Sequence, residues 1–308
     1  MIQADEPRLL IADDVGVGKT IEAGLILKEM EARARDASEN VSNTLSVLVI
    51  CPKPLVTENK WVDEMKRFDE NFENLDGSAL GQCFEYCEKN GIWPENRSKV
   101  IVPYSLFNEK TVLGTQASGK GAKRIGLKDL NPKPHFDLVI VDEAHTIRNP
   151  QTLNYQGVKM FCQEADAVIF LTATPIQNGN RDLYTLLHLL RPDIVTDEKT
   201  FESMSEPNTA INRMLRIVRA QKDNWQEDAL KEATKIQRTK WGREFILGDP
   251  DYQEVLETLN KKSVTREERV ALIEKIEGLH SFNVSVTTKV RFHSAVSLMG
   301  SLFPMVQH

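Results

Sequence analysis

Five short apolar runs recur along the first 170 residues, and each is followed by a polar segment or by apolar residues at helical spacing. A nearly continuous apolar run of this length predicts a strand that is buried on both faces. Strands of this kind, separated by helical patterns, predict an α/β fold with a parallel sheet covered by helices on both faces. The five predicted strands are Leu9–Ala12, Ser46–Cys51, Lys99–Pro103, Asp137–Val141 and Ala167–Leu171.

The pattern between these runs predicts helices. Ile21 to Met30 has apolar residues at helical spacing, and the charged stretch from Glu31 to Asn43 is interpreted as the frayed end of that helix plus a loop. Trp61, Met65 and Phe68 predict an amphipathic helix. Gln82–Cys87 is predicted as a further strand.

The pattern changes after about residue 195. Charged helical segments without strand signals follow from about Lys199 to His280. We therefore predict a sheet domain over residues 1–195 and a C-terminal α-helical appendage over residues 196–283. Residues 284–308 form an atypical tail in which only Lys289 and Arg291 are charged.

Composition narrows the class of protein. Hydrophobic residues at 41% and charged residues at 27% are ordinary for a soluble globular protein. The net charge of −6 argues against a surface that is basic overall, so nucleic-acid binding would need a local patch. No apolar run approaches the roughly 20 residues of a membrane span, and no signal peptide is evident. The four cysteines lack metal-ligand spacing, so they are interpreted as reduced thiols in a cytoplasmic protein. No membrane partner is expected.

One local patch is basic. From Lys110 to Pro134, six cationic residues stand against Asp129 alone: Lys110, Lys120, Lys123, Arg124, Lys128 and Lys133. A mobile, solvated loop is the simpler interpretation, and a loop that contacts phosphates is the alternative.

The first predicted strand leads into a glycine turn and then a helix. Gly16 and Gly18 allow the backbone to curl so that its N–H groups face a triphosphate at the positive end of the helix. Lys19 would reach the β- and γ-phosphates, and the Thr20 hydroxyl would sit on Mg²⁺. The alternative is a glycine-rich strand-to-helix turn that carries a lysine by chance. Asp13 stands where the strict phosphate-loop pattern has its first glycine.

Asp142 and Glu143 follow the fourth predicted strand. Adjacent carboxylates there could cap the following helix, since aspartate is a good N-cap residue. The functional interpretation divides the work between them. Asp142 holds Mg²⁺, directly or through water, and Glu143 orients and deprotonates the water that attacks the γ-phosphorus.

Four segments together resemble one family. Asp13–Thr20 (DDVGVGKT), Cys51–Pro52 with Trp61, Asp142–His145 (DEAH) and Leu171–Asn178 (LTATPIQN) appear in the order of motifs I, Ia, II and III of the SWI/SNF-type ATPases. These are helicase-like double-stranded DNA translocases of helicase superfamily two, and the RapA/HepA-like branch is the most similar. The resemblance covers roughly Arg8 to Asp193 well.

The resemblance implies a RecA-like P-loop domain that binds ATP and Mg²⁺. It implies that Glu143, Asp142 and Lys19 are catalytic and that Thr20 and Asp142 hold the metal. His145 and Thr172–Pro175 would couple the nucleotide to DNA, which would be contacted near Pro52–Lys53 and Tyr104–Ser105. The residues implied to surround the nucleotide are Asp13, Asp14, Val15, Gly16, Val17, Gly18, Lys19 and Thr20.

The sequence departs from the family pattern in several places. Asp14 and Val17 replace the usual glutamate and leucine of motif I. The adenine-recognising glutamine segment and the second RecA-like lobe, with its arginine finger, are not found among the 308 residues. We therefore expect the first lobe of a two-lobe motor, nearly inactive by itself. Its expected partners are double-stranded DNA, the missing second lobe and other proteins of a DNA-processing complex.

Two expectations remain open at this point. A stand-alone nucleotide- or DNA-binding module that switches without hydrolysis is the alternative function. The tail from Val284 to His308 is expected to be out of frame with the motor sequence, because a frameshift near Asn283 would explain its low charge.

Overall fold

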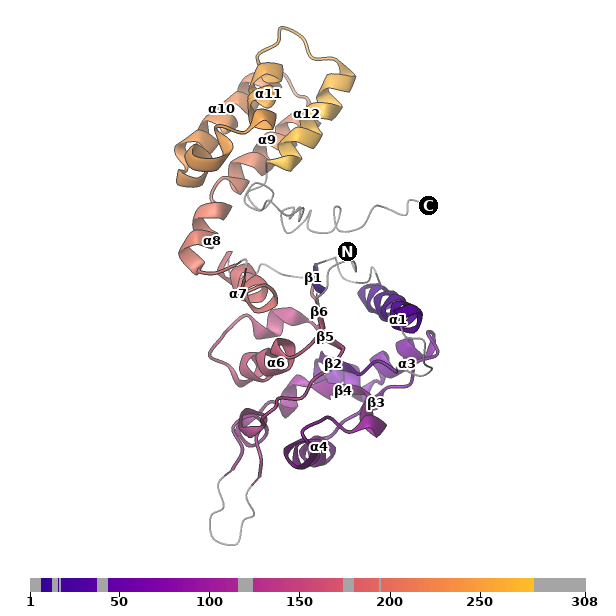
Figure 1. Ribbon diagram of the computed structural model, residues 1–308. Helices are drawn as coiled ribbons and strands as arrows, with labels where there is room; N and C mark the ends of the chain where they lie inside the picture. The colour runs from indigo at the N-terminus through magenta and orange to yellow at the C-terminus, as the bar shows by residue number, and fades with distance from the viewer. Residues whose placement is uncertain are drawn as a thin grey trace. The chain divides into compact units, whose positions relative to one another are not determined.

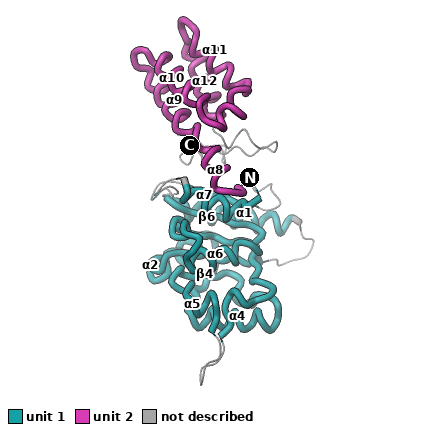
Figure 2. The backbone as a smooth tube through the Cα atoms, turned by 90° about the vertical axis from the view of Figure 1, so that its left-hand side faces the viewer, with its two compact units in different colours: residues 1–194 teal, residues 195–308 magenta. Residues whose placement is uncertain are grey.

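The computed structural model describes residues 7–12, 16, 18–37, 44–115, 124–173, 180–193 and 195–279. The chain divides into two compact units, Met1–Ile194 and Val195–His308 (Figure 2). The two units are described separately below.

The first unit is built on a six-stranded sheet in which all neighbouring strands are parallel, in the order β1-β6-β5-β2-β4-β3. The parallel α/β fold predicted from the apolar runs is confirmed. β3 was not predicted, because a two-residue strand carries no readable pattern. The strands are β1 (Arg8–Ile11), β2 (Val47–Cys51), β3 (Glu73–Asn74), β4 (Lys99–Pro103), β5 (Leu138–Asp142) and β6 (Ala167–Leu171).

Helices cover both faces of this sheet. α1 and α3 lie on one side of it, and α6 and α7 lie on the other (Figure 1). The helices of this unit are α1 (Lys19–Ala37), α2 (Lys53–Thr57), α3 (Lys60–Lys66), α4 (Gly77–Asn90), α5 (Glu109–Val112), α6 (Leu153–Gln163) and α7 (Asn180–Leu190). Short 3₁₀ turns are η1 (Glu95–Arg97), η2 (Tyr104–Leu106), η3 (Leu127–Asp129) and η4 (Ala144–Ile147).

The strand predicted at Gln82–Cys87 is wrong, because these residues lie inside α4. The buried residues of α4 are Leu80, Cys83, Phe84 and Cys87, which repeat at the helical period and not at the period of two that a strand requires. Asp76 caps the helix by accepting hydrogen bonds from the N–H groups of Ser78 and Ala79.

α1 is longer than the sequence pattern predicted. It continues through Glu31, where a frayed end was expected, to Ala37. Glu31 is ordered by two lysines: the Lys99 Nζ lies 2.6 Å and the Lys28 Nζ 3.2 Å from its carboxylate. Both lysines also pair with the buried Glu70, so the far half of α1 is joined to the start of β4 by charge pairs.

The second unit is helical over its described part, residues 195–279, where no strand occurs. Its four longest helices pack around a core that includes Ile211, Met214, Val218, Tyr252 and Ile276. The helices predicted from about Lys199 onward are therefore present. They are α8 (Glu198–Ser205), α9 (Asn208–Ala220), α10 (Trp225–Arg238), the π-helical turn η5 (Gly242–Ile246), α11 (Pro250–Leu259) and α12 (Arg266–Gly278).

Both ends of the basic segment are folded. Thr115 and Arg124 form an antiparallel bridge, and Val112, Leu127 and Leu130 are buried. Lys133 is directed back at the chain, where its Nζ donates to the main-chain oxygens of Lys128 and Leu130 at 2.7 and 2.5 Å. The middle of the segment, residues 116–123, and the predicted tail, residues 284–308, lie outside the described residues.

The structure also bears on the predictions about the cysteines and about membrane-spanning segments. All four cysteines are buried free thiols. Across the described ranges, no helix has both the length and the apolar character needed to cross a membrane.

Candidate functional site

The carboxyl ends of three neighbouring strands meet at one level of the sheet. Ile11 at the end of β1 pairs with Leu171 of β6, which in turn pairs with Asp142 of β5. Neighbouring strands lie roughly 4.8 Å apart, so the ends of β1 and β5 are about 10 Å from one another. Thr172 follows β6 between them, and its N–H donates to the Ile11 oxygen at 2.9 Å. Ligands of open parallel sheets bind at this edge.

The start of α1 provides one side of the site. Gly16 and Gly18 have φ of 84° and 95°, a conformation that favours glycine. The Gly18 oxygen accepts hydrogen bonds from the N–H groups of Ile21 and Glu22 at 2.8 and 3.1 Å, so Lys19 and Thr20 form the first turn of the helix. A helix N-terminus leaves N–H groups without intrahelical partners and favours an anion.

The remaining predicted loop residues, Asp13, Asp14, Val15 and Val17, lie outside the described residues, as does the motif III segment after Ala173. The described helix start therefore represents only half of the predicted phosphate cradle.

Asp142 is held at three points. Its Oδ1 accepts a hydrogen bond from the Glu143 N–H at 2.9 Å, and its Oδ2 accepts one from the Trp61 indole Nε1 at 2.9 Å. The Tyr104 hydroxyl donates to the Asp142 main-chain oxygen at 2.8 Å. The Asp142 side chain is only 8% exposed, so these bonds are made in the interior.

The electrostatics of Asp142 suit a metal ligand. Burial raises the pKa of this carboxyl, even though the hydrogen bonds from Trp61 and from the Glu143 N–H act in the opposite direction. In the described part of the chain, no lysine, arginine or histidine forms an ion pair with it.

Mg²⁺ is commonly held by one or two carboxylates together with substrate phosphates and water. A buried carboxylate that forms no ion pair with a described residue, and on which Lys60 acts only through its charge, fits that use. The described residues contain no group of three or more His, Cys, Asp or Glu side chains that would cage a metal by itself.

Glu143 turns the chain away from β5. It has φ 49° and ψ 50°, in the left-handed region that a residue with a side chain rarely adopts. Its Oε2 lies 3.1 Å from the His145 Nδ1, and the same nitrogen lies 3.5 Å from the buried Thr172 hydroxyl. These contacts bring motifs II and III together. The Glu143 side chain is 35% exposed, so its carboxylate can reach a water molecule.

The helix-capping alternative for these carboxylates is wrong. The only main-chain N–H that donates to the Asp142 carboxylate in the described residues is that of the next residue, and Glu143, which precedes η4, makes no side-chain capping bond. Capping would require a bond to an N–H two or three positions further on.

The residues expected to contact DNA differ in accessibility. Lys53, the first residue of α2 after β2, is exposed, and so is Ser105 after β4. Tyr104 is only 5% exposed and its hydroxyl donates a hydrogen bond to the Asp142 main-chain oxygen, so its side chain faces the interior.

The sequence analysis placed Tyr104 with the DNA contacts and Trp61 on an amphipathic face, and it missed that both residues hold Asp142. The available signal was chemical, because buried Trp and Tyr normally find a partner for their N–H or O–H.

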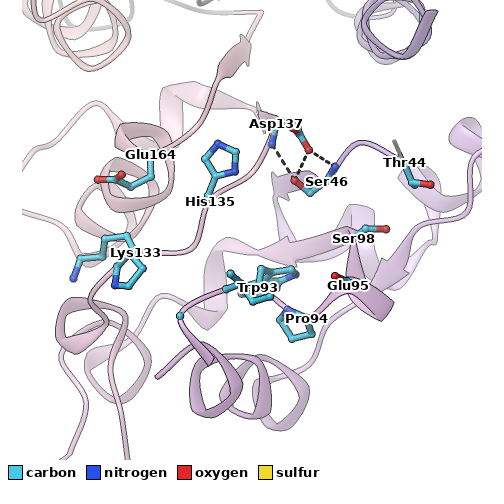
Figure 3. A pocket seen from close by; sticks show the side chains of 13 residues that line it. Thr44, Ser46, Trp93, Pro94, Glu95, Ser98, Lys133, His135, Asp137 and Glu164 are labelled. Atoms are coloured by element: carbon cyan, nitrogen blue, oxygen red, sulfur yellow. Dashed lines mark hydrogen bonds between the residues drawn. The ribbon is translucent and has the colours of Figure 1, made fainter. Parts of the chain in front are cut away.

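A pocket of about 720 Å³ lies at the opposite edge of the sheet (Figure 3). Ser46, Ser98 and Asp137, which precede β2, β4 and β5, line it together with Lys133 and His135. Asp137 is directed toward Ser46, whose N–H and hydroxyl both donate to it at 2.6 Å. This pocket is separate from the motif-bearing strand ends.

Comparison with known proteins identifies relatives in several bacteria. RNA polymerase-associated protein RapA of Pasteurella multocida (strain Pm70) is 34% identical over 205 residues, which are 65% of this chain and 19% of the relative. The uncharacterized ATP-dependent helicase YqhH of Bacillus subtilis (strain 168) is 30% identical over 195 residues, which are 63% of this chain and 28% of the relative. The chain thus spans about a fifth of the length of the first relative and just over a quarter of the second.

A solved structure, the Sulfolobus solfataricus SWI2/SNF2 ATPase core in complex with double-stranded DNA, matches 64% of this chain and 34% of that chain at 23% identity and a TM-score of 0.44. The SNF2-related domain matches residues 2–240. Because that match covers well over half of the sequence, the chain belongs to the SNF2-related family, and its parallel sheet is the helicase-like, RecA-like lobe that the motifs implied.

Proposed function

We propose that the chain is the ATP-binding lobe of a DNA-dependent ATPase that translocates on double-stranded DNA. It would hydrolyse ATP to ADP and phosphate when joined to a second RecA-like lobe. The observation that carries this proposal is the alignment of Ile11, Leu171 and Asp142 across β1, β6 and β5, which gathers three motifs at one edge. The match to the SNF2-related domain, and the relatives named as an ATP-dependent helicase and as an RNA polymerase-associated protein, support the use of ATP and a protein partner.

The residues of this edge would share the work of binding. Lys19 would contact the β- and γ-phosphates, and the main chain from Asp13 to Gly18 would surround them. Thr20 and Asp142 would hold Mg²⁺, which neutralises phosphate charge when it is bound. We also propose domains over residues 1–195 and 196–283, and a cytoplasmic location, which the free thiols support.

Glu143 would act on the attacking water. Its carboxylate would orient the water and accept its proton while the new bond forms to the γ-phosphorus and ADP leaves. His145, in contact with both Glu143 and Thr172, would fix the orientation of that carboxylate. The family's arginine finger comes from the second lobe and is worth about 10³–10⁵ in rate, so this lobe alone should bind ATP but turn it over slowly.

Nucleotide binding provides the first test. A fluorescent ATP analogue is titrated into the wild-type chain and into Lys19→Ala, with the exposed Lys89→Ala on α4 as the matched control. Removing Lys19 should weaken binding by about 2–4 kcal/mol, by analogy with truncating one member of a buried charge pair, and the control should not. Equal affinity in all three proteins would show that the phosphates bind elsewhere.

Phosphate release, measured with and without duplex DNA, provides the second test. Glu143→Gln should keep the affinity for the nucleotide and lose the turnover. If the lobe joined to a second lobe binds ATP and DNA but never releases phosphate, the non-hydrolysing switch module becomes the better description.

A further inference from the structure

Two aromatic residues hold the predicted metal carboxylate from different elements. Trp61 on α3 donates its indole N–H to the Asp142 Oδ2, although the two residues are 81 positions apart. Tyr104 in η2 donates its hydroxyl to the Asp142 main-chain oxygen from 38 positions away. α3 follows β2 and η2 follows β4, so both donors come from the segments that follow the strands on one side of β5.

We propose that Trp61 is a positioning residue for the Mg²⁺ site: its indole N–H fixes the orientation of the Asp142 carboxylate in which that carboxylate binds the metal. This inference rests on the proposed function, because it takes Asp142 to be a ligand of Mg²⁺. Trp61 itself is 1% exposed, so it would act on the metal only through Asp142.

The hydrogen-bond geometry carries the proposal. An ionised carboxylate has about four lone-pair positions on its two oxygens. The Glu143 N–H occupies one on Oδ1 and the Trp61 N–H occupies one on Oδ2, so each oxygen is held by a different donor. Rotation of the carboxylate about its Cβ–Cγ bond would break both bonds. The remaining lone pairs are therefore presented in one direction.

The Trp61 donor is itself enclosed by the core. A ring that is 1% exposed has little room to change rotamer, and the neighbouring Met65 on the same helix is fully buried. Tyr104 fixes the main chain at the last residue of β5, where the ladder to β2 has already ended at Val141. Partners of this kind behind a metal ligand commonly determine metal affinity, and their loss typically costs 10–100-fold.

The competing interpretation is that Trp61 only fills the core. Trp61→Phe separates the two, because phenylalanine keeps a buried ring and removes the N–H. Trp93→Phe is the matched control. Trp93 is also buried, at 7% exposed, and its Nε1 also donates a hydrogen bond, to the Arg97 oxygen at 2.7 Å. Trp93 lines the pocket at the opposite edge of the sheet.

The experiment measures the Mg²⁺ concentration that half-saturates binding of a non-hydrolysable fluorescent ATP analogue. For Trp61→Phe this concentration should rise about tenfold or more. The affinity for the metal-free analogue in excess EDTA should stay at the wild-type value. Trp93→Phe should change neither quantity, and thermal unfolding of each variant verifies that it is folded.

A second readout leaves Trp61 in place. The indole N–H signals of the ¹⁵N-labelled chain are assigned by replacing Trp93, Trp225 and Trp241 one at a time. Adding Mg²⁺ to the nucleotide complex should shift the Trp61 signal and leave the Trp93 signal unchanged. This measurement decides the matter if Trp61→Phe does not fold.

The outcomes separate the two proposals. If the wild-type chain binds no nucleotide with or without Mg²⁺, the proposed function fails and the inference fails with it. If the wild-type chain binds the Mg²⁺ complex but a folded Trp61→Phe has the same Mg²⁺ dependence, or the Trp61 signal does not move, only the positioning role is overturned.

Discussion

Glu70 and Asp142 are buried carboxylates of the sheet lobe whose surroundings differ. Glu70, 5% exposed, lies beside Lys99 at the start of β4 and pairs with both Lys99 and Lys28. Asp142, 8% exposed, lies at the carboxyl end of β5, where its donors are uncharged N–H groups. One carboxylate is neutralised by its own chain, and in the described residues the other is not.

The pKa shifts differ between the Glu70 network and Asp142 in the same way. Burial by itself would raise the pKa of Glu31, a member of the Glu70 network, but hydrogen bonds and charge from Lys99, together with a hydrogen bond from Lys28, outweigh it and lower the pKa. For Asp142 the effect of burial prevails and the pKa is raised. The comparison indicates that the network around Glu70 stabilises the fold, whereas under the proposed function the strand ends around Asp142 would receive an external cation.

The largest expected effect concerns the paired network. Lys99→Met removes the more buried of the two lysines, whose side chain is 9% exposed, and leaves Glu31 and Glu70 to share Lys28. We expect the free energy of unfolding to fall by about 3–5 kcal/mol in chemical denaturation, the usual loss when one member of a buried pair is removed.

Lys28→Met is the control for that measurement. Its side chain is 36% exposed, so water screens the charges and the loss should stay below about 1 kcal/mol. Equal losses from the two variants would contradict the division between a buried and a screened lysine.

A smaller effect is expected along α1, the helix that joins Lys19 to Glu31. A methyl group at Gly24 would lie 2.4 Å from a ring carbon of Phe68. Gly24→Ala should therefore destabilise the protein by about 1–3 kcal/mol, as overpacking usually does. In Gly81→Ala on α4 the added methyl meets nothing within 4 Å, so this variant should be more stable by about 0.5–1 kcal/mol. Thermal unfolding of the two variants checks this. If both variants were more stable than the wild type, or both less stable, the predicted overpacking at Gly24 would be wrong.

Acidification should change the contributions of Glu31 and Asp142 to the free energy of unfolding in opposite directions. The folded-state pKa of Glu31 lies below its ordinary value of 4.5, so its contribution to stability is complete above pH 4.5 and is lost as the pH falls through the folded-state pKa. Glu31→Gln should therefore lose less stability than the wild type on acidification below pH 4.5.

Asp142 has a folded-state pKa above its ordinary value of 3.8, so protonating it favours the fold as the pH falls through that raised pKa. Asp142→Asn should lack this gain. Unfolding free energies of the wild type and both variants, measured from neutral pH into this range, check the two slopes. If the unfolding free energies of Glu31→Gln and Asp142→Asn changed with pH in parallel, the predicted opposite contributions of the two residues would be wrong.

The smallest effect concerns the backbone beside Asp142. Glu143 adopts φ 49°, which costs a residue with a Cβ about 1–2 kcal/mol, whereas glycine loses more chain entropy on folding. Glu143→Gly and Glu143→Ala both remove the carboxylate, and we expect the glycine variant to be more stable by up to about 1 kcal/mol. A more stable alanine variant in denaturant titration would show that this turn is not strained.

Much of the sheet could be predicted because its strands are buried on both faces. Runs such as Val47–Cys51 and Ala167–Leu171 are apolar throughout, and their polar successors pointed to the edge where Asp142 and Thr172 lie. The same rule failed at Gln82–Cys87, because a short segment with Cys83, Phe84 and Cys87 fits a strand as easily as one turn of a helix.

Contacts between distant segments could not be predicted. Nothing in the local pattern around Trp61 distinguishes a tryptophan that fills a core from one that donates to a carboxylate 81 positions away. The network of Lys28, Glu70 and Lys99 could not be predicted either. Its members come from α1, from the turn after α3 and from β4, and in the sequence each looks like an ordinary surface charge.

The buried cysteines have a practical consequence for chemical labelling. Burial raises the pKa of Cys51, Cys87 and Cys162 to about 12 and raises that of Cys83 as well, so the reactive thiolate is scarce at neutral pH. A maleimide dye should therefore react very slowly with the native thiols. A single cysteine introduced at the exposed Ser105 would accept the dye selectively, without first removing any cysteine from the core, and would report directly on whatever approaches that edge.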